Sequence, residues 1–235
     1  MKIAIYTLTR DRVEYTREFL RLIETNAGCE YDHFVLDNGS KDGTAEYLRS
    51  YFHQCSHVHV ALRPENLGIS KASNICVREI LARDVYDLIV KMDNDLALRH
   101  PETLAAVANI YATCPEASRW VLSPSVVGIN RQPRRVNYTV IGGRPVGIVP
   151  IIGGLFHAVP VAIYRAFMAD GGYDETLPLA WGQDDQFCEW LRVNGYKKGY
   201  IEDLQVEHME TTDGQAKRYP DYFRRKWIEE KERPA

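Results

Sequence analysis

Tyr86-Asp87-Leu88-Ile89-Val90-Lys91-Met92-Asp93-Asn94-Asp95 is the stretch that indicates the fold of this chain. Its apolar part is typical of a buried strand, which ends abruptly at two acids separated by one residue. The last side chains of a strand and the turn that follows can converge on a crevice at the carboxyl edge of a sheet. Two carboxylates there suit a hard divalent cation, which prefers oxygen ligands and shares them with substrate phosphates. Asp-x-Asp also occurs in ordinary strand-end turns, so the rest of the chain decides its meaning.

Strands and helices alternate along the first half of the chain. Apolar segments predict strands over 2–9, 31–37, 58–62, 87–92 and 120–123. Helical periodicity and helix start signals predict helices over 12–26, 44–51, 69–83 and from 101 to about 114. This order predicts an α/β fold with a mainly parallel sheet and helices on both faces.

The composition and periodicity of the sequence change after residue 124. Residues 126–156 are rich in Gly, Val and Ile without a helical period, which predicts short strands and loops. The further expected elements are helices over 161–169 and 184–194, a strand over 196–208 and a charged helix over 219–232. No repeat or clear linker divides the chain, so we expect a single domain.

Composition narrows the class of protein. The chain has 235 residues, enough for one large domain with a substantial core. Its net charge of -3 gives no electrostatic footprint for nonspecific nucleic-acid binding. The five scattered cysteines form no Cys-x-x-Cys, which argues for reduced thiols. The longest uncharged apolar stretch, 146–156, falls short of the roughly 20 residues of a membrane span. We expect a soluble, cytoplasmic protein.

Two further segments carry polar residues at a strand end and a helix start. Residues 37–44 read Asp-Asn-Gly-Ser-Lys-Asp-Gly-Thr, and a strand-end acid with a glycine turn suits recognition of a base or ribose. An EF-hand is excluded because its third and fifth positions would be glycine and lysine. Gly68 precedes a helix whose N-terminus favours an anion, and Lys71 and Asn74 share one face of that helix. A plain turn and a plain helix start are the ordinary alternatives.

In order and spacing, these segments resemble the family 2 glycosyltransferases of GT-A fold. The family pattern has a Thr-rich turn after its first strand, here at 7–12, and a V-D-[DN]-G-S-x-D-G-T block, here at 36–44. An N-x-G-x-x-x-x-x-N helix start follows at 66–74, and the metal motif is Asp93-Asn94-Asp95. The resemblance covers about residues 1–210. It implies a Rossmann-like sheet with a small additional sheet on the acceptor side.

The resemblance divides the single domain into a nucleotide-binding half (about 1–124), an acceptor half (about 125–210) and a helical tail (211–235). It implies that the nucleotide-sugar site is lined by Thr7, Thr9, Arg10, Asp37, Asn66, Gly68, Lys71, Asn74, Asp93 and Asn94. Asp95, Asp93 and His208 would hold Mn2+ or Mg2+, because His208 resembles the family's third ligand and imidazole suits manganese. The donor would be a nucleoside-diphosphate sugar, with a UDP-sugar favoured.

A second acidic motif, Trp181-Gly182-Gln183-Asp184-Asp185, opens an expected helix. Acids at a helix start are commonly explained by the helix dipole. In the family this place carries an acidic pair whose second member is the general base. The resemblance therefore makes Asp185 the base, which takes the proton of the acceptor hydroxyl. The residues expected to bind the acceptor are Asp184, Trp181, Gly153 and Gly154; a core tryptophan and a bulge are the ordinary alternatives.

The resemblance implies a metal-dependent, inverting glycosyltransferase that acts on a hydroxyl acceptor of unspecified class. A retaining transferase of the same fold and a noncatalytic nucleotide- or glycan-binding module are the alternatives. The presence of Asp93, Asp95, Asp185 and His208 together argues against the noncatalytic module. A sugar-phosphate nucleotidylyltransferase would need a Gly-rich loop after the first strand, and residues 7–12 contain no glycine.

Overall fold

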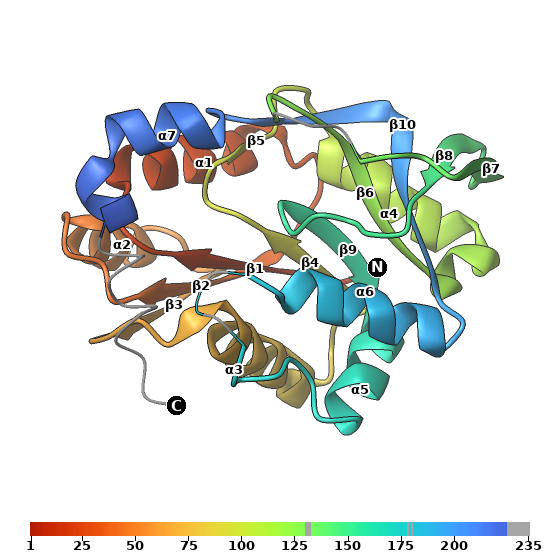
Figure 1. Cartoon of the computed structure of the whole chain (residues 1–235), viewed down its shortest axis with the longest axis horizontal. Helices are drawn as coiled ribbons and strands as arrows, with labels where there is room; N and C mark the ends of the chain where they lie inside the picture. Colours follow the sequence, from red (N-terminus) through yellow and green to blue (C-terminus); the bar gives the residue numbers. More distant parts are fainter. Residues whose placement is uncertain (130–132, 178, 180, 225–235) are drawn as a thin grey trace.

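A single sheet runs through the structure. The computed structural model describes residues 1–129, 133–177, 179 and 181–224. The strands are β1 (Ile3–Thr9), β2 (Asp32–Asn38), β3 (Val58–Arg63), β4 (Leu88–Met92), β5 (Leu96–Ala97), β6 (Trp120–Val127), β7 (Asn137–Ile141), β8 (Arg144–Ile148), β9 (Phe156–Pro160) and β10 (Lys197–His208). The helices are α1 (Val13–Asn26), α2 (Thr44–Phe52), α3 (Gly68–Arg83), α4 (Thr103–Thr113), the 3-10 helix η1 (Pro115–Arg119), α5 (Val161–Ala169), α6 (Gln183–Val193) and α7 (Thr212–Arg218). The strand order is β3-β2-β1-β4-β9-β6-β10-β8-β7, and β5 pairs with β10 (Figure 1).

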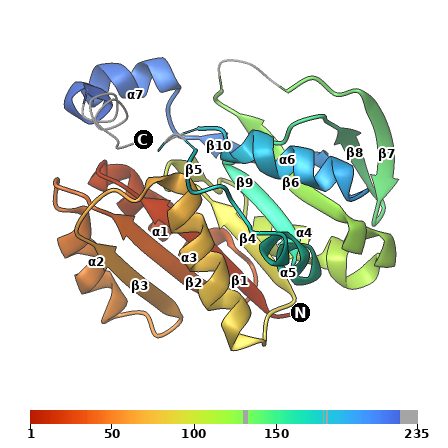
Figure 2. The same ribbon diagram turned by 60° about the horizontal axis from the view of Figure 1, so that its bottom comes forward.

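The first half of the chain forms a parallel layer. β1 pairs in parallel with β2 and β4, and β2 pairs in parallel with β3. The helices α1 and α3 cover opposite faces of these strands (Figure 1, Figure 2). Both faces of β1 are therefore buried, and its Ile, Ala and Tyr side chains all lie in the core. The predicted order of strands and helices is observed in this half.

The second half adds antiparallel and parallel strands to the same sheet. β9 pairs antiparallel with β4, β10 pairs parallel with β6, and β8 pairs antiparallel with β10 and β7. The sequence does not predict β9, because His157 and Pro160 interrupt its apolar run. The strand predicted over 120–123 continues to Val127. Pro124 pairs where the register of β10 shifts, so its missing N–H falls at a place where the ladder is already irregular.

The C-terminal segment returns to the first half. Tyr219 packs edge-on against Tyr15 of α1 with ring centroids 5.4 Å apart, and its hydroxyl donates to Glu14 at 3.0 Å. This places α7 beside α1 (Figure 1). Residues 225–232 of the helix predicted from the sequence lie outside the described residues. Among the described helices, none has the length and apolar character needed to cross a bilayer.

Candidate active site

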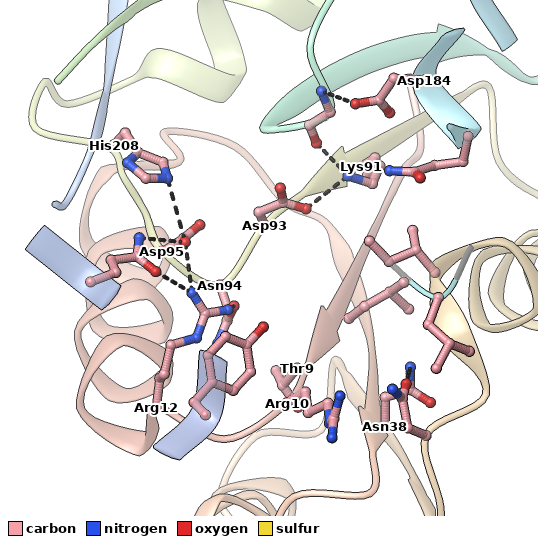
Figure 3. Close-up of a pocket in the computed structure, with 18 of the residues that line it drawn as sticks. Thr9, Arg10, Arg12, Asn38, Lys91, Asp93, Asn94, Asp95, Asp184 and His208 are labelled. Carbon is pink, nitrogen blue, oxygen red and sulfur yellow. Dashed lines mark hydrogen bonds and ion pairs between the residues drawn. The ribbon is translucent and has the colours of Figure 1, made fainter. Parts of the chain in front are cut away.

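A pocket of about 320 Å³ opens where parallel strands end (Figure 3). Segments far apart in the sequence line it, including the ends of β1, β2, β4 and β10 and the start of α6. The residues predicted from the sequence that line this pocket are Thr9, Arg10, Asn66, Asp93, Asn94, Asp95, Gly154, Asp184 and His208. The convergence expected at the carboxyl edge of the sheet is therefore observed.

The other predicted residues do not line the pocket; they are Thr7, Asp37, Gly68, Lys71, Asn74, Gly153, Trp181 and Asp185. Thr7 is buried and its hydroxyl lies 2.9 Å from His33 Nε2. Asp37 is buried and accepts a hydrogen bond from the Thr9 hydroxyl at 3.1 Å, which orders the strand ends. Lys71 is exposed on α3.

Asn74 and Gly68 serve packing in α3. Asn74 is fully buried; its Nδ2 donates to the Tyr173 carbonyl at 2.8 Å, and its Oδ1 accepts from the Tyr173 N–H at 2.9 Å. The amide of Asn74 therefore anchors the segment that leads to α6. A Cβ at Gly68 would lie 2.9 Å from Leu179 Cδ2, and the residue has a φ of +78°, so glycine permits this close approach.

Asp93 is paired with a lysine that the sequence analysis did not assign to the site. Lys91 Nζ lies 2.7 Å from Asp93 Oδ1, and the Lys91 side chain is 5% exposed. Burial raises the pKa of Asp93, and the charge of Lys91 opposes that shift. Burial lowers the pKa of Lys91, but Asp93 and Asp184 outweigh it and the net shift is upward. The sequence feature that could have identified Lys91 is its position as a charged residue within an apolar strand.

Asp95 lies at the centre of a second cluster. Its Oδ2 accepts from Arg12 Nη1 at 3.0 Å and from Gln215 Nε2 at 2.9 Å, and it lies 3.4 Å from His208 Nε2. Burial raises the pKa of Asp95, but the hydrogen bond from His208 and the charge of Arg12 hold it well below its usual range. Burial also lowers the pKa of His208, and Asp95 reverses that effect into a net increase.

Arg12 reaches this cluster from a strained turn. Asp11 and Arg12 have φ values of 52° and 63°, in the left-handed region that non-glycine residues rarely adopt. The turn is held because Asp11 N–H donates to Ser40 Oγ at 2.7 Å and Asp11 Oδ1 accepts from Lys41 N–H at 2.7 Å. Strain of this kind is concentrated at functional sites. Sequence reasoning missed Arg12 because only the folded turn directs its guanidinium to Asp95.

The residues at this end of the pocket suit a divalent cation whose remaining ligands come from a bound substrate and water. Asp95 and His208 supply a carboxylate and an imidazole within 3.4 Å of each other. Within the described residues, no group of three or more His, Cys, Asp or Glu side chains could hold a metal. The other ligands would therefore come from substrate phosphates and water, as is usual for Mg2+ sites. Arg12 and Gln215 contact the same oxygen of Asp95, so a cation would compete with them.

The two acids at the start of α6 differ in environment. Asp184 lines the pocket, and its Oδ2 accepts from the Gly154 N–H at 2.8 Å. Asp185 is exposed and does not line the pocket. Trp181 is 39% exposed and also lies outside the lining. The fold thus separates two neighbouring carboxylates that the sequence presents as a pair.

Residues 4–135 match the family model described as Glycosyl transferase family 2. No curated protein sequence matches the chain significantly. Among solved structures, the mannosyltransferase PcManGT from Pyrobaculum calidifontis, in complex with GDP-Man and Mn2+, has a TM-score of 0.66 and 16% identity. That similarity covers 97% of this chain and 61% of PcManGT.

Two other solved structures are similarly related. TarS of S. aureus has a TM-score of 0.68 and 16% identity, over 97% of this chain and 65% of TarS. GalNAc-T7, with UDP, GalNAc and Mn2+, has a TM-score of 0.68 and 13% identity, over 88% of this chain and 43% of GalNAc-T7. The chain therefore matches between 43% and 65% of the length of these structures. At such low identity they inform on the fold alone, and they confirm the predicted α/β fold of GT-A type.

Proposed function

The chain belongs to glycosyl transferase family 2, and on this premise we propose that it moves a sugar from a nucleoside-diphosphate sugar to a hydroxyl acceptor. The observation that carries the proposal is the pocket itself. Its lining includes Asp95 beside His208 and, from another segment, Asp184 of α6. A candidate cation-binding pair and a further carboxylate around one cavity suit a leaving diphosphate and an attacking hydroxyl.

The nucleotide would bind at the ends of β1 and β2. Thr9, Arg10 and Asn66 line that part of the pocket together with Asn38, whose Nδ2 donates to Asn66 Oδ1 at 2.9 Å. These side chains offer polar atoms to a base and ribose. A UDP-sugar is the favoured donor, and TarS of S. aureus has been seen with UDP-GlcNAc. PcManGT binds GDP-Man, so a guanine nucleotide belongs in any test.

Asp95 and His208 would hold Mn2+ or Mg2+, which supplies Lewis-acid stabilisation of the diphosphate leaving group. PcManGT and GalNAc-T7 were both solved with Mn2+. Arg12 contributes positive charge next to the same carboxylate, 3.0 Å from Asp95 Oδ2. An arginine so placed can bind phosphate oxygens through its planar fork.

The acidic pair would supply the general base for a single displacement with inversion. We assign this role to Asp185, because Asp184 Oδ2 already accepts the Gly154 N–H at 2.8 Å. The exposed carboxylate of Asp185 is open to an acceptor that arrives from solvent. The position of Asp184 in the pocket lining favours the opposite assignment, and paired substitutions distinguish the two.

A thermal-shift panel tests the proposed function directly. Purified protein with Mn2+ is heated with UDP-glucose, UDP-N-acetylglucosamine, GDP-mannose and, as a control, ATP. A true donor should raise the melting temperature, because a ligand at 100 times its Kd adds about 2.7 kcal/mol of stability. Release of nucleoside diphosphate from that donor is then measured. The absence of any shift and of any release across the panel would contradict the proposal.

A further inference from the structure

Lys91 is a buried charge for which strand formation gives no reason. It lies on β4, where the other residues are Leu, Ile, Val and Met. Its side chain is 5% exposed, yet it lines the pocket. Burying an ammonium costs free energy unless it is paired and hydrogen-bonded. The presence of a lysine in this strand therefore points to a role in the pocket.

The ammonium of Lys91 joins two segments of the site. Its Nζ lies 2.7 Å from Asp93 Oδ1 and also donates to the carbonyl oxygen of Gly154. The N–H of Gly154 donates to Asp184 Oδ2 at 2.8 Å. Gly154 is therefore held at its carbonyl by Lys91 and at its N–H by Asp184. Figure 3 shows this chain of contacts running from Asp93 through Lys91 to Asp184.

The ends of two charged side chains lie close to the Cα of Gly154. A Cβ at this position would lie 2.7 Å from both carboxylate oxygens of Asp184 and 2.8 Å from Lys91 Nζ. The ammonium and the carboxylate therefore converge on the same glycine. A side chain at this position would therefore have to displace the end of the Asp184 or the Lys91 side chain.

The charges of this cluster restrict what can bind against it. Two carboxylates, of Asp93 and Asp184, outnumber the single ammonium of Lys91, so an anionic group is disfavoured. Sugar hydroxyls can donate to the carboxylates and accept from the ammonium. An ammonium has three donors; two are engaged by Asp93 and Gly154, and the described residues provide no hydrogen-bond acceptor for the third.

We propose that Lys91, with Asp93 and Asp184, forms the subsite for the donor's sugar, and that this subsite takes a neutral, polyhydroxylated sugar. The inference rests on the proposed function, and it moves Asp184 from the acceptor to the donor sugar. Asp93 lies two residues from Asp95, which faces the diphosphate in that function. The sugar attached to the diphosphate therefore reaches Asp93 and Lys91 first. Lys91 determines specificity through its free donor and positions Asp184 through Gly154.

Calorimetric titration of nucleotides with and without the sugar tests this role. The probes are UDP, UDP-glucose, GDP and GDP-mannose, each with Mn2+. Lys91→Met should bind the free diphosphate within about two-fold of wild type. It should bind the matching nucleotide sugar about 10- to 100-fold more weakly, the effect of losing a charged hydrogen bond. Lys197→Met makes the same change at a lysine that is 58% exposed, and it should leave both affinities unchanged.

Gly154→Ala provides an independent variant. It inserts a methyl group between Asp184 and Lys91 without changing any charge. It should therefore weaken binding of the nucleotide sugar and leave the affinity for the free diphosphate nearly unchanged. This variant decides the question if Lys91→Met does not fold. Equal weakening of both ligands would overturn the inference, because Lys91 would then serve the phosphates or the fold. Unchanged binding of both ligands in the folded variants would overturn it as well.

The choice of sugar has its own test. Wild-type protein should bind UDP-glucose more tightly than UDP-glucuronate, and the reverse order would overturn the neutral-sugar assignment. A wild-type protein that bound none of the nucleotides would contradict the proposed function itself, and the inference with it. If Lys91→Met loses affinity for the nucleotide sugar but keeps its affinity for the free diphosphate, the sugar subsite is tested separately from the proposed function.

Discussion

Asp93 and Asp95 are two residues apart, yet they meet different cations and their pKa values move in opposite directions. Burial raises the pKa of Asp93 against the opposing charge of Lys91. For Asp95, burial acts the same way, but His208 and Arg12 outweigh it and the pKa falls. In a strand, side chains at i and i+2 point to the same face. Asp93 and Asp95 lie in the turn after β4, where this alternation does not apply, so their side chains reach different environments. These contacts favour the ionised form of Asp95, which the proposed metal role requires.

The metal role of Asp95 gives the first prediction. EDTA should abolish transfer and weaken donor binding, and Mn2+ or Mg2+ should restore both. Asp95→Asn should lower turnover by about 100-fold or more, since several kcal/mol of charge stabilisation are lost. Turnover and donor affinity are measured with and without chelator. Asp203→Asn, at an exposed acid on β10, should behave as wild type. Full turnover in EDTA would exclude the metal role.

The acidic pair gives the second prediction. Asp185→Asn keeps the size of the side chain but removes the proton acceptor, so turnover should fall by roughly 100- to 10,000-fold. Donor affinity should barely change, because Asp185 does not line the pocket. Asp184→Asn should mainly weaken binding of a sugar. If Asp184→Asn loses more turnover than Asp185→Asn, then Asp184 is the base. Single-turnover rates and donor Kd of both variants distinguish these outcomes.

At the scale of elements, α3 positions α6 through one buried amide. Asn74 of α3 makes two hydrogen bonds with the backbone of Tyr173 and a third, at 3.0 Å, with Glu175 Oε1. The segment that they hold leads to α6, where Gln186 Oε1 accepts from the Asp174 N–H at 2.9 Å. The acidic pair at the start of α6 therefore depends on a residue that never reaches the pocket.

The third prediction follows from this anchor. Asn74→Ala leaves buried backbone groups of Tyr173 without partners, so the free energy of unfolding should fall by about 1–3 kcal/mol. Turnover should fall more than nucleotide affinity. The substitution removes a support of α6, which carries the acidic pair, but it leaves the ends of β1 and β2, where the nucleotide would bind, unchanged. Urea unfolding and donor binding measure the two effects. Asn109→Ala, at an exposed position of α4, is the matched control and should change neither. Equal stability of the two variants would contradict the anchoring role.

At the scale of the whole molecule, the core buries histidines that must stay neutral. His33 is 1% exposed, and its Nε2 lies 2.9 Å from the Thr7 hydroxyl. Burial, aided by the charges of His57 and His59, lowers the pKa of His33 to about 3. An unfolded histidine has a pKa of about 6.5. Below that value the unfolded chain takes up a proton that native His33 does not, so stability is complete above about pH 6.5 and is lost as the pH falls toward 3.

The fourth prediction isolates this effect. Between about pH 6.5 and 4.5, His33 should lower the free energy of unfolding by about 1.4 kcal/mol per pH unit. His33→Gln cannot titrate, so its deficit relative to wild type at pH 7.5 should shrink across this window. Urea unfolding of both proteins at four pH values gives the two slopes. Parallel slopes would show that His33 is protonated in the native state or does not contribute.

The sequence by itself determined the parallel part of the fold, and it predicted a metal motif directly after one of its strands. Its signals were local: apolar runs, glycine turns, and Asp93-Asn94-Asp95 directly after a strand. Such patterns report secondary structure and strand ends because both depend on neighbouring residues. Strand β9 escaped them, since its burial between β4 and β6 comes from pairing across the sheet. The four ordered blocks also identified the family before any contact was known.

Only the tertiary structure decided which polar residues face the pocket. Three pocket residues come from different kinds of element: Lys91 from a strand, Arg12 from a left-handed turn and Gln215 from a distant helix. No local sequence pattern shows that their side chains point into the pocket. Asn74 matched the motif, but long-range hydrogen bonds direct its amide to Tyr173. Asp184 and Asp185 are adjacent in sequence, and the packing of α6 alone places one of them in the pocket. Side-chain direction depends on contacts between segments far apart in the chain, which spacing along the sequence does not encode.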